Sequence, residues 1–121
     1  ALMEITGTTR GTQYDGIDVT GLLTYGGDLI ITADTLIAHG IYDLFGLTSE
    51  TGEFASIILS GAAYTNNAFT QFGDIWTVTV GDDTYTFSQI TGDLTVVPEP
   101  GTYALIGGMF ALVYVMLGRR R

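Results

Sequence analysis

The sequence predicts a mainly β protein: an antiparallel β-sandwich or barrel-like domain followed by one C-terminal transmembrane α-helix. Three observations lead to this fold class. Several segments alternate apolar and polar residues with a period of two, glycine, asparagine and aspartate turns separate them at short intervals, and an uncharged apolar run lies near the C-terminus. A chain of 121 residues has room for one such domain.

The expected strands follow one another at near-regular spacing along residues 1–97. They are residues 2–8, 17–25, 28–33, 36–45 (one bent strand or two short ones), 54–63, 75–80, 84–90 and 94–97. The glycine pair Gly26-Gly27 predicts a hairpin between the second and third strands, because type I′ turns require positive φ. The polar segment 48–52 and the pair Asn66-Asn67 predict turns. We expect no convincing internal repeat and no helix longer than two turns in this part of the chain.

The clearest hairpin joins residues 75–80 to residues 84–90. Apolar residues alternate with threonine in its first strand, and aromatic residues alternate with threonine and serine in its second. The connection Gly81-Asp82-Asp83 consists of residues that favour tight turns. These two strands should therefore pair antiparallel.

The charge of the chain is divided sharply. Residues 1–97, which we call the body, carry twelve carboxylates against one base, Arg10, so their net charge is −11, against −9 for the whole chain. Such a surface repels phosphate groups, which excludes nucleic acid as a partner.

The chain contains no cysteine, so disulfides and thiolate metal sites are excluded. It begins at Ala1, and we expect that an export signal has been removed.

The C-terminal part of the chain predicts a membrane anchor. No charged residue interrupts residues 102–118, and a helix of about 17–25 apolar residues crosses a bilayer. The cluster Arg119, Arg120 and Arg121 follows directly, and basic residues next to a span mark its cytoplasmic side. The body should therefore lie outside the cytoplasm. Small residues at helical spacing, Ala104, Gly108 and Ala111, predict a face that another helix can approach closely.

Between the body and the span stands the elbow 98–101. Its two prolines, Pro98 and Pro100, flank Glu99 and interrupt any strand or helix. Proline-glutamate-proline, an apolar helix and an arginine cluster, in this order at a C-terminus, resemble the PEP-CTERM sorting tail of Gram-negative bacteria. The resemblance covers residues 97–121 and implies that the three residues form a recognition motif for an exosortase, a membrane enzyme that cuts near it. It also implies a Gram-negative envelope with exopolysaccharide machinery, and it implies nothing about the fold of the body.

The body offers few residues suited to catalysis or metal binding. His39 is the single histidine, and a catalytic triad or zinc site needs partners that the sequence does not place beside it, so we expect a strand or interface residue. The carboxylates occupy turns such as Asp82-Asp83 and show no EF-hand spacing, although separate loops could still build a Ca²⁺ site. Aromatic residues that could stack on sugars are Tyr14, Tyr25, Tyr42, Tyr64 and Trp76, of which Trp76 fits the core better.

The sequence therefore favours a non-catalytic structural or interaction protein. We expect an exported, membrane-anchored accessory subunit that packs against a larger membrane or envelope assembly, with no cofactor. One alternative is an exosortase-processed surface or biofilm-matrix protein. Another is a carbohydrate- or Ca²⁺-binding β-module, and an enzyme is the least favoured reading.

Overall fold

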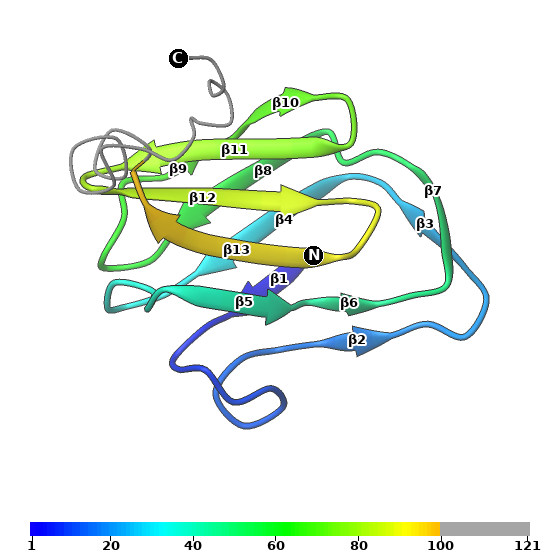
Figure 1. The fold of residues 1–121 in the computed structure, drawn as a ribbon, viewed down its shortest axis with the longest axis horizontal. Coiled ribbons are helices and arrows are strands. Elements are labelled where there is room, and N and C mark those ends of the chain that lie inside the picture. Colours follow the sequence, from blue (N-terminus) through cyan, green and yellow to red (C-terminus); the bar gives the residue numbers. More distant parts are fainter. Residues whose placement is uncertain (100–121) are drawn as a thin grey trace, which may run out of the picture.

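The computed structural model describes residues 1–99, which form a two-layered β-domain (Figure 1). These residues contain thirteen short strands and no α-helix. The predictions of a mainly β fold and of no long helix in the body are therefore confirmed. Residues 100–121, which include the expected span 102–118, lie outside the described residues.

The first layer is a four-stranded sheet in which three strands run parallel. Its order is β1 (Leu2–Glu4), β4 (Asp28–Thr32), β8 (Ser56–Ser60) and β9 (Asn67–Ala68), and only β9 is antiparallel to its neighbour. Leu2 pairs with Ile30, which pairs in turn with Ile58, so equivalent positions are 28 residues apart. The chain therefore returns to the same sheet at a constant interval.

Two small parallel sheets repeat this arrangement beside the first layer. β2 (Ile17–Asp18) pairs with β6 (Phe45–Gly46), and β3 (Leu22–Tyr25) pairs with β7 (Ser49–Gly52). The register between β2 and β6 is again 28 residues. Residues 1–52 thus form two stacked coils, in which each strand of the second coil lies on its equivalent in the first.

The sequence interpretation is wrong in several respects for this half of the body. The domain is not purely antiparallel, a 28-residue repeat exists, and segment 48–52 contributes the strand β7 instead of a turn. The expected hairpin at Gly26-Gly27 does not form, because β3 pairs with β7 while β4 enters a different sheet. Gly27 does adopt a positive φ, but it turns the chain around a corner without reversing it onto itself.

The second layer is an antiparallel sheet of five strands. Its order is β10 (Thr70–Phe72), β11 (Ile75–Val80), β12 (Asp83–Ser88), β13 (Asp93–Pro98) and β5 (Gly40–Asp43). The pairing of β11 with β12 confirms the hairpin that the sequence predicted most clearly. Asn66 has a positive φ, but the turn expected at Asn66-Asn67 is placed too late, because Asn67 already belongs to β9. Strand β5 comes from the second coil and joins this sheet through β13.

One hydrophobic core lies between the two layers. Alternate residues of each strand point inward, for example Leu29 and Ile31 on β4, and Tyr85 and Phe87 on β12. Burying such a side chain stabilises the fold by about 1.5–3 kcal/mol. Figure 1 shows the five-stranded layer crossing in front of β4 and β8, with β2, β3, β6 and β7 along one side. This arrangement fixes the outward face of each sheet and the place where the C-terminal tail begins.

Candidate functional site

The C-terminal end of the domain brings three chain segments together around Pro98. β13 ends at Pro98, which lies opposite Asp83 of β12. The backbone N–H of Glu99 donates a hydrogen bond to the carbonyl oxygen of Asp82 at 2.7 Å. The ring Nε2 of His39 lies 2.7 Å from Oδ1 of Asp83. We call these five residues the exit cluster, because the tail leaves the domain here.

The strand geometry explains why proline fits at position 98. The bond from Glu99 to Asp82 makes Pro98 and Asp83 a non-hydrogen-bonded pair of the antiparallel ladder. The nitrogen of Pro98 therefore points away from β12. On its other side, β5 reaches no further along β13 than the pair between Gly40 and Val96. Proline has no N–H to donate, and at this position no hydrogen bond of the sheet depends on one. Proline is therefore compatible with the last position of β13.

The exit cluster is acidic. Asp82, Asp83 and Glu99 carry carboxylates, and the His39 side chain is 53% exposed. A negative surface of this kind is repelled by anionic lipid head groups.

The other residues predicted for this site lie outside the described residues. They are Pro100, Ala104, Gly108, Ala111, Arg119, Arg120 and Arg121. Within residues 1–99 no helix is long and apolar enough to cross a bilayer. The boundary predicted between body and elbow moves by one residue, because Pro98 belongs to β13.

His39 lies immediately before β5, and its ring contacts β12 through Asp83. The sequence did not reveal this pairing, because the two residues are distant in the chain. In the part of the chain that the structure describes, no three histidine, cysteine or acidic residues gather in a way that could hold a metal ion.

A pair of carboxylates that the sequence did not single out lies at the opposite end of β13. Asp93 pairs directly with Asp43 of β5. Arg10 lies beside this pair, with its Nε 3.7 Å from Oδ2 of Asp43, while its Nη2 is 2.9 Å from Oδ1 of Asp18. Burial raises the pKa of Asp93, and the negative charge of Asp43 and a hydrogen bond with its carboxyl group raise it further.

We expect Asp93→Asn to stabilise the protein at neutral pH. The pKa of Asp93 in the folded state is higher than its ordinary value of 3.8. Between the ordinary pKa and the raised one, the folded state binds more protons than the unfolded state. The stability of the fold therefore falls as pH rises through this range. Asparagine does not titrate, so Asp93→Asn removes the repulsion between two like charges that face each other across strands. The free energy of unfolding should rise by about 0.5 kcal/mol at pH values above this range and stay unchanged below it. Thermal unfolding at pH 7 and pH 3 measures this difference.

The matched control is Asp74→Asn, which removes one charge from an exposed turn. An equal gain of stability from this control at pH 7 would mean that the effect comes from net charge. In that case the contact between Asp93 and Asp43 would not be the cause.

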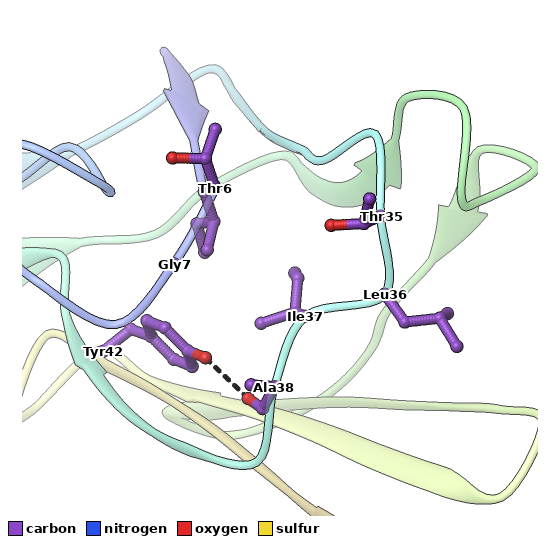
Figure 2. Close-up of a pocket in the computed structure, with 8 residues that line it drawn as sticks. Thr6, Gly7, Thr35, Leu36, Ile37, Ala38 and Tyr42 are labelled. Atoms are coloured by element: carbon purple, nitrogen blue, oxygen red, sulfur yellow. Dashed lines mark hydrogen bonds between the residues drawn. The ribbon is translucent and has the colours of Figure 1, made fainter.

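A small pocket lies between the segment that follows β1 and the segment that precedes β5 (Figure 2). Thr6 and Gly7 face Thr35 and Ile37 across it, and the hydroxyl of Tyr42 donates a hydrogen bond to the carbonyl oxygen of Ala38 at 2.6 Å. Its volume is about 70 Å³. Ligand pockets usually measure about 300–1,000 Å³, so this one accommodates a few water molecules.

The aromatic residues proposed as sugar-stacking candidates are all buried. Trp76 belongs to the core, as expected, and so do the four tyrosines Tyr14, Tyr25, Tyr42 and Tyr64. Tyr14 and Tyr42 pack edge to face with their ring centroids 5.2 Å apart, which an exposed stacking platform would not allow. The exposed aromatic ring of the five-stranded sheet is Phe72, at its outer strand.

No family model, curated protein or solved structure matches this chain. The arrangement described above therefore carries the functional argument by itself. The ion pairs within residues 1–99 join Arg10 to Asp18 and Asp43, and His39 to Asp83. In the described part of the chain every buried polar side-chain atom has a hydrogen-bond partner.

Proposed function

We propose that this protein is a non-catalytic, exported, membrane-anchored interaction protein, an accessory subunit of a larger membrane or envelope assembly. The observation that carries the proposal is the order of the C-terminal sequence. A proline-glutamate-proline motif, the uncharged run 102–118 and three arginines follow the end of β13. The exit cluster supports it, because hydrogen bonds hold the start of this tail at one edge of the domain.

The proposed anchor sets the location and orientation of the protein. An arginine at the centre of a bilayer costs about 2.5–3.5 kcal/mol on insertion scales, so Arg119, Arg120 and Arg121 stay outside the hydrocarbon. As the basic end of the span they face the cytoplasm, and the acidic body faces the periplasm or the outer side. The resemblance to PEP-CTERM tails places this membrane in a Gram-negative envelope.

Contacts within the membrane then attach the protein to its assembly. Apolar surface alone gives two helices in lipid no reason to associate, because the lipid tails are equally apolar. Close backbone approach and dispersion supply the energy, and small residues permit that approach. The face formed by Ala104, Gly108 and Ala111 is suited to such a contact.

The proposal predicts that Gly108→Leu separates the protein from its assembly without releasing it from the membrane. Leucine keeps the span apolar but holds a neighbouring helix away. The full chain is purified from gently solubilised membranes, and the proteins that accompany it are quantified by mass spectrometry. We expect these proteins to fall at least tenfold for the variant, while the amount of the variant in the membrane fraction stays unchanged.

The matched control is Val113→Leu, which adds bulk on the opposite side of the helix. Retention of the same accompanying proteins by Gly108→Leu would show that the span is only a tether. A wild-type chain that purifies alone would contradict the accessory-subunit proposal.

Processing by an exosortase is the second candidate, and the motif Pro98-Glu99-Pro100 is the feature that favours it. In that case the mature protein is a surface or matrix component that has lost its span. The intact mass of the protein recovered from cells distinguishes the two functions. A chain that retains Arg121 supports the permanent anchor, and a chain that ends near the motif supports processing.

A further inference from the structure

The first two residues of the elbow belong to the folded sheet. Pro98 is the last residue of β13, and the backbone N–H of Glu99 donates a hydrogen bond to the carbonyl oxygen of Asp82, which continues the ladder between β12 and β13. Figure 1 shows the start of β12, the end of β13 and the start of β5 on the same side of the molecule. We call Pro98 and Glu99 the junction, because the tail begins there.

The hydrogen bond between His39 and Asp83 joins the two strands that flank the junction. β13 lies between β12 and β5 in the sheet, Asp83 is the first residue of β12, and His39 immediately precedes β5. The register fixes where this bond lies along β13, because Asp83 is the partner of Pro98. A carboxylate only accepts hydrogen bonds, so Nε2 of His39 donates to Oδ1 of Asp83 at 2.7 Å. We call this contact the clasp.

An enzyme that cuts a peptide chain has to bind it as an isolated extended strand. Such a strand is recognised through its backbone N–H and C=O groups, while alternate side chains enter pockets. The edge of β13 that faces β12 is occupied as far as Glu99. On the other edge, pairing with β5 ends at Val96, and the clasp follows directly. The junction therefore cannot enter an enzyme cleft while the end of β13 remains in the sheet.

We propose that the body closes the junction, so that a processing endopeptidase reaches it only when the end of β13 detaches. The inference rests on the second candidate function, in which the motif is cut, and adds its regulation. The cut is hydrolysis of a peptide bond, in which water adds to the carbonyl carbon and the amine of the next residue leaves. The body supplies no group to that reaction. It sets the fraction of time for which the strand end is open, and such local opening requires less free energy than global unfolding.

The clasp changes this open fraction by a modest factor. Its two side chains are partly exposed, and a partly exposed pair contributes little free energy. Loss of the clasp should therefore raise the open fraction about two- to fivefold. The carboxylates of Asp82, Asp83 and Glu99 repel one another, so no new attraction between them replaces the clasp when it is lost.

Hydrogen exchange at the backbone N–H of Glu99 measures the opening without any enzyme. In the full chain, this amide should exchange at least tenfold more slowly than in a peptide of residues 95–103, which has no partner strand. His39→Ala and Asp83→Ser each remove one half of the clasp and should raise the exchange rate about two- to fivefold. The matched control is Asp18→Asn, which weakens the ion pair with Arg10 on β2 and should leave the rate unchanged.

Cleavage of the full chain by an added glutamyl endopeptidase tests whether the same opening limits cutting. Enzymes of this kind cut after glutamate but not before proline, so Pro100→Ala makes the bond after Glu99 cleavable. Mass spectrometry follows the product that ends at Glu99. We expect its formation to be at least tenfold slower than from the peptide with the same substitution. Adding His39→Ala should raise the rate about two- to fivefold.

Three results would overturn the inference. They are exchange at Glu99 as fast as in the peptide, cleavage of the folded chain as fast as that of the peptide, and rates that loss of the clasp leaves unchanged. Processing in cells is measured separately from the intact mass. If the wild type and His39→Ala both retain Arg121, the processing function fails, while exchange at Glu99 still decides whether the body closes the junction.

Discussion

Gly92→Ala is expected to lower the free energy of unfolding by about 2–5 kcal/mol, the sum of a left-handed backbone penalty and the cost of overpacking. Gly92 has a φ of 75°, a backbone conformation that residues other than glycine rarely adopt. A Cβ atom there would meet the carbonyl oxygen of Phe45, and the Cβ of Phe45 would be 2.9 Å away. Neither neighbour moves easily, because the Gly92 carbonyl accepts hydrogen bonds from the N–H groups of Leu44 and Phe45.

Gly81→Ala is the matched control for this prediction. Gly81 also has a positive φ of 60°, but a Cβ atom there has no neighbour within 4 Å. Its replacement should cost only the backbone penalty of about 1–2 kcal/mol. Urea unfolding followed by circular dichroism measures both variants. Equal losses of stability in the two variants would mean that the close contact between position 92 and Phe45 adds nothing to the cost of the substitution.

The sequence predicted best those features that depend on residues close together in the chain. The hairpin of β11 and β12 follows from alternation within each strand and from the turn residues Gly81-Asp82-Asp83. The end of the last strand at a proline is also local, because proline itself terminates the ladder. In both cases the amino acids that decide the structure are neighbours.

The parallel stack was missed because its strands are too short to show a period. β2 and β6 contain two residues each, and the parallel sheets are made by pairing across 28 residues, or across 27 between β3 and β7. One trace of the repeat is present in the sequence, where Tyr14-Asp15 and Tyr42-Asp43 are separated by the same interval. The two tyrosines pack edge to face in the core. A search for equal spacing of such pairs would have revealed the coils.

Contacts between distant strands required the strand register. Alternation predicted outward threonines on β11 and β12, but only the pairing of β10, β11, β12 and β13 aligns Thr70, Thr77, Thr86 and Thr95 in a row. The contact of Asp43 with Asp93, and that of His39 with Asp83, likewise join residues more than forty positions apart. Composition and spacing contain no information about such contacts until the fold is known.

Gln89→Met is expected to destabilise the domain by about 2–5 kcal/mol, although methionine has a similar length and volume. Gln89 is a fully buried polar residue at the end of β12. Its Oε1 accepts a hydrogen bond from Nε1 of Trp76 at 2.8 Å, and its Nε2 donates one to the carbonyl oxygen of Gly52 at 3.2 Å. Methionine leaves the N–H of the buried Trp76 without a hydrogen bond in the interior, which costs about 1–3 kcal/mol. It also removes the hydrogen bond to the carbonyl oxygen of the exposed Gly52, which is worth about 0.5–1.5 kcal/mol. The bond from Tyr25 to the backbone carbonyl of residue 89 is kept.

A double-mutant cycle with Trp76→Phe separates the lost hydrogen bond from the change of shape. Phenylalanine removes the indole N–H, so the double variant no longer buries that unsatisfied donor. We therefore expect the double variant to be more stable than the sum of the single changes predicts, with a coupling energy of about 1–2 kcal/mol. Urea unfolding followed by circular dichroism measures all four proteins without relying on fluorescence of the single tryptophan. Additive losses would show that Gln89 acts through packing and that its bond to Trp76 contributes little to stability.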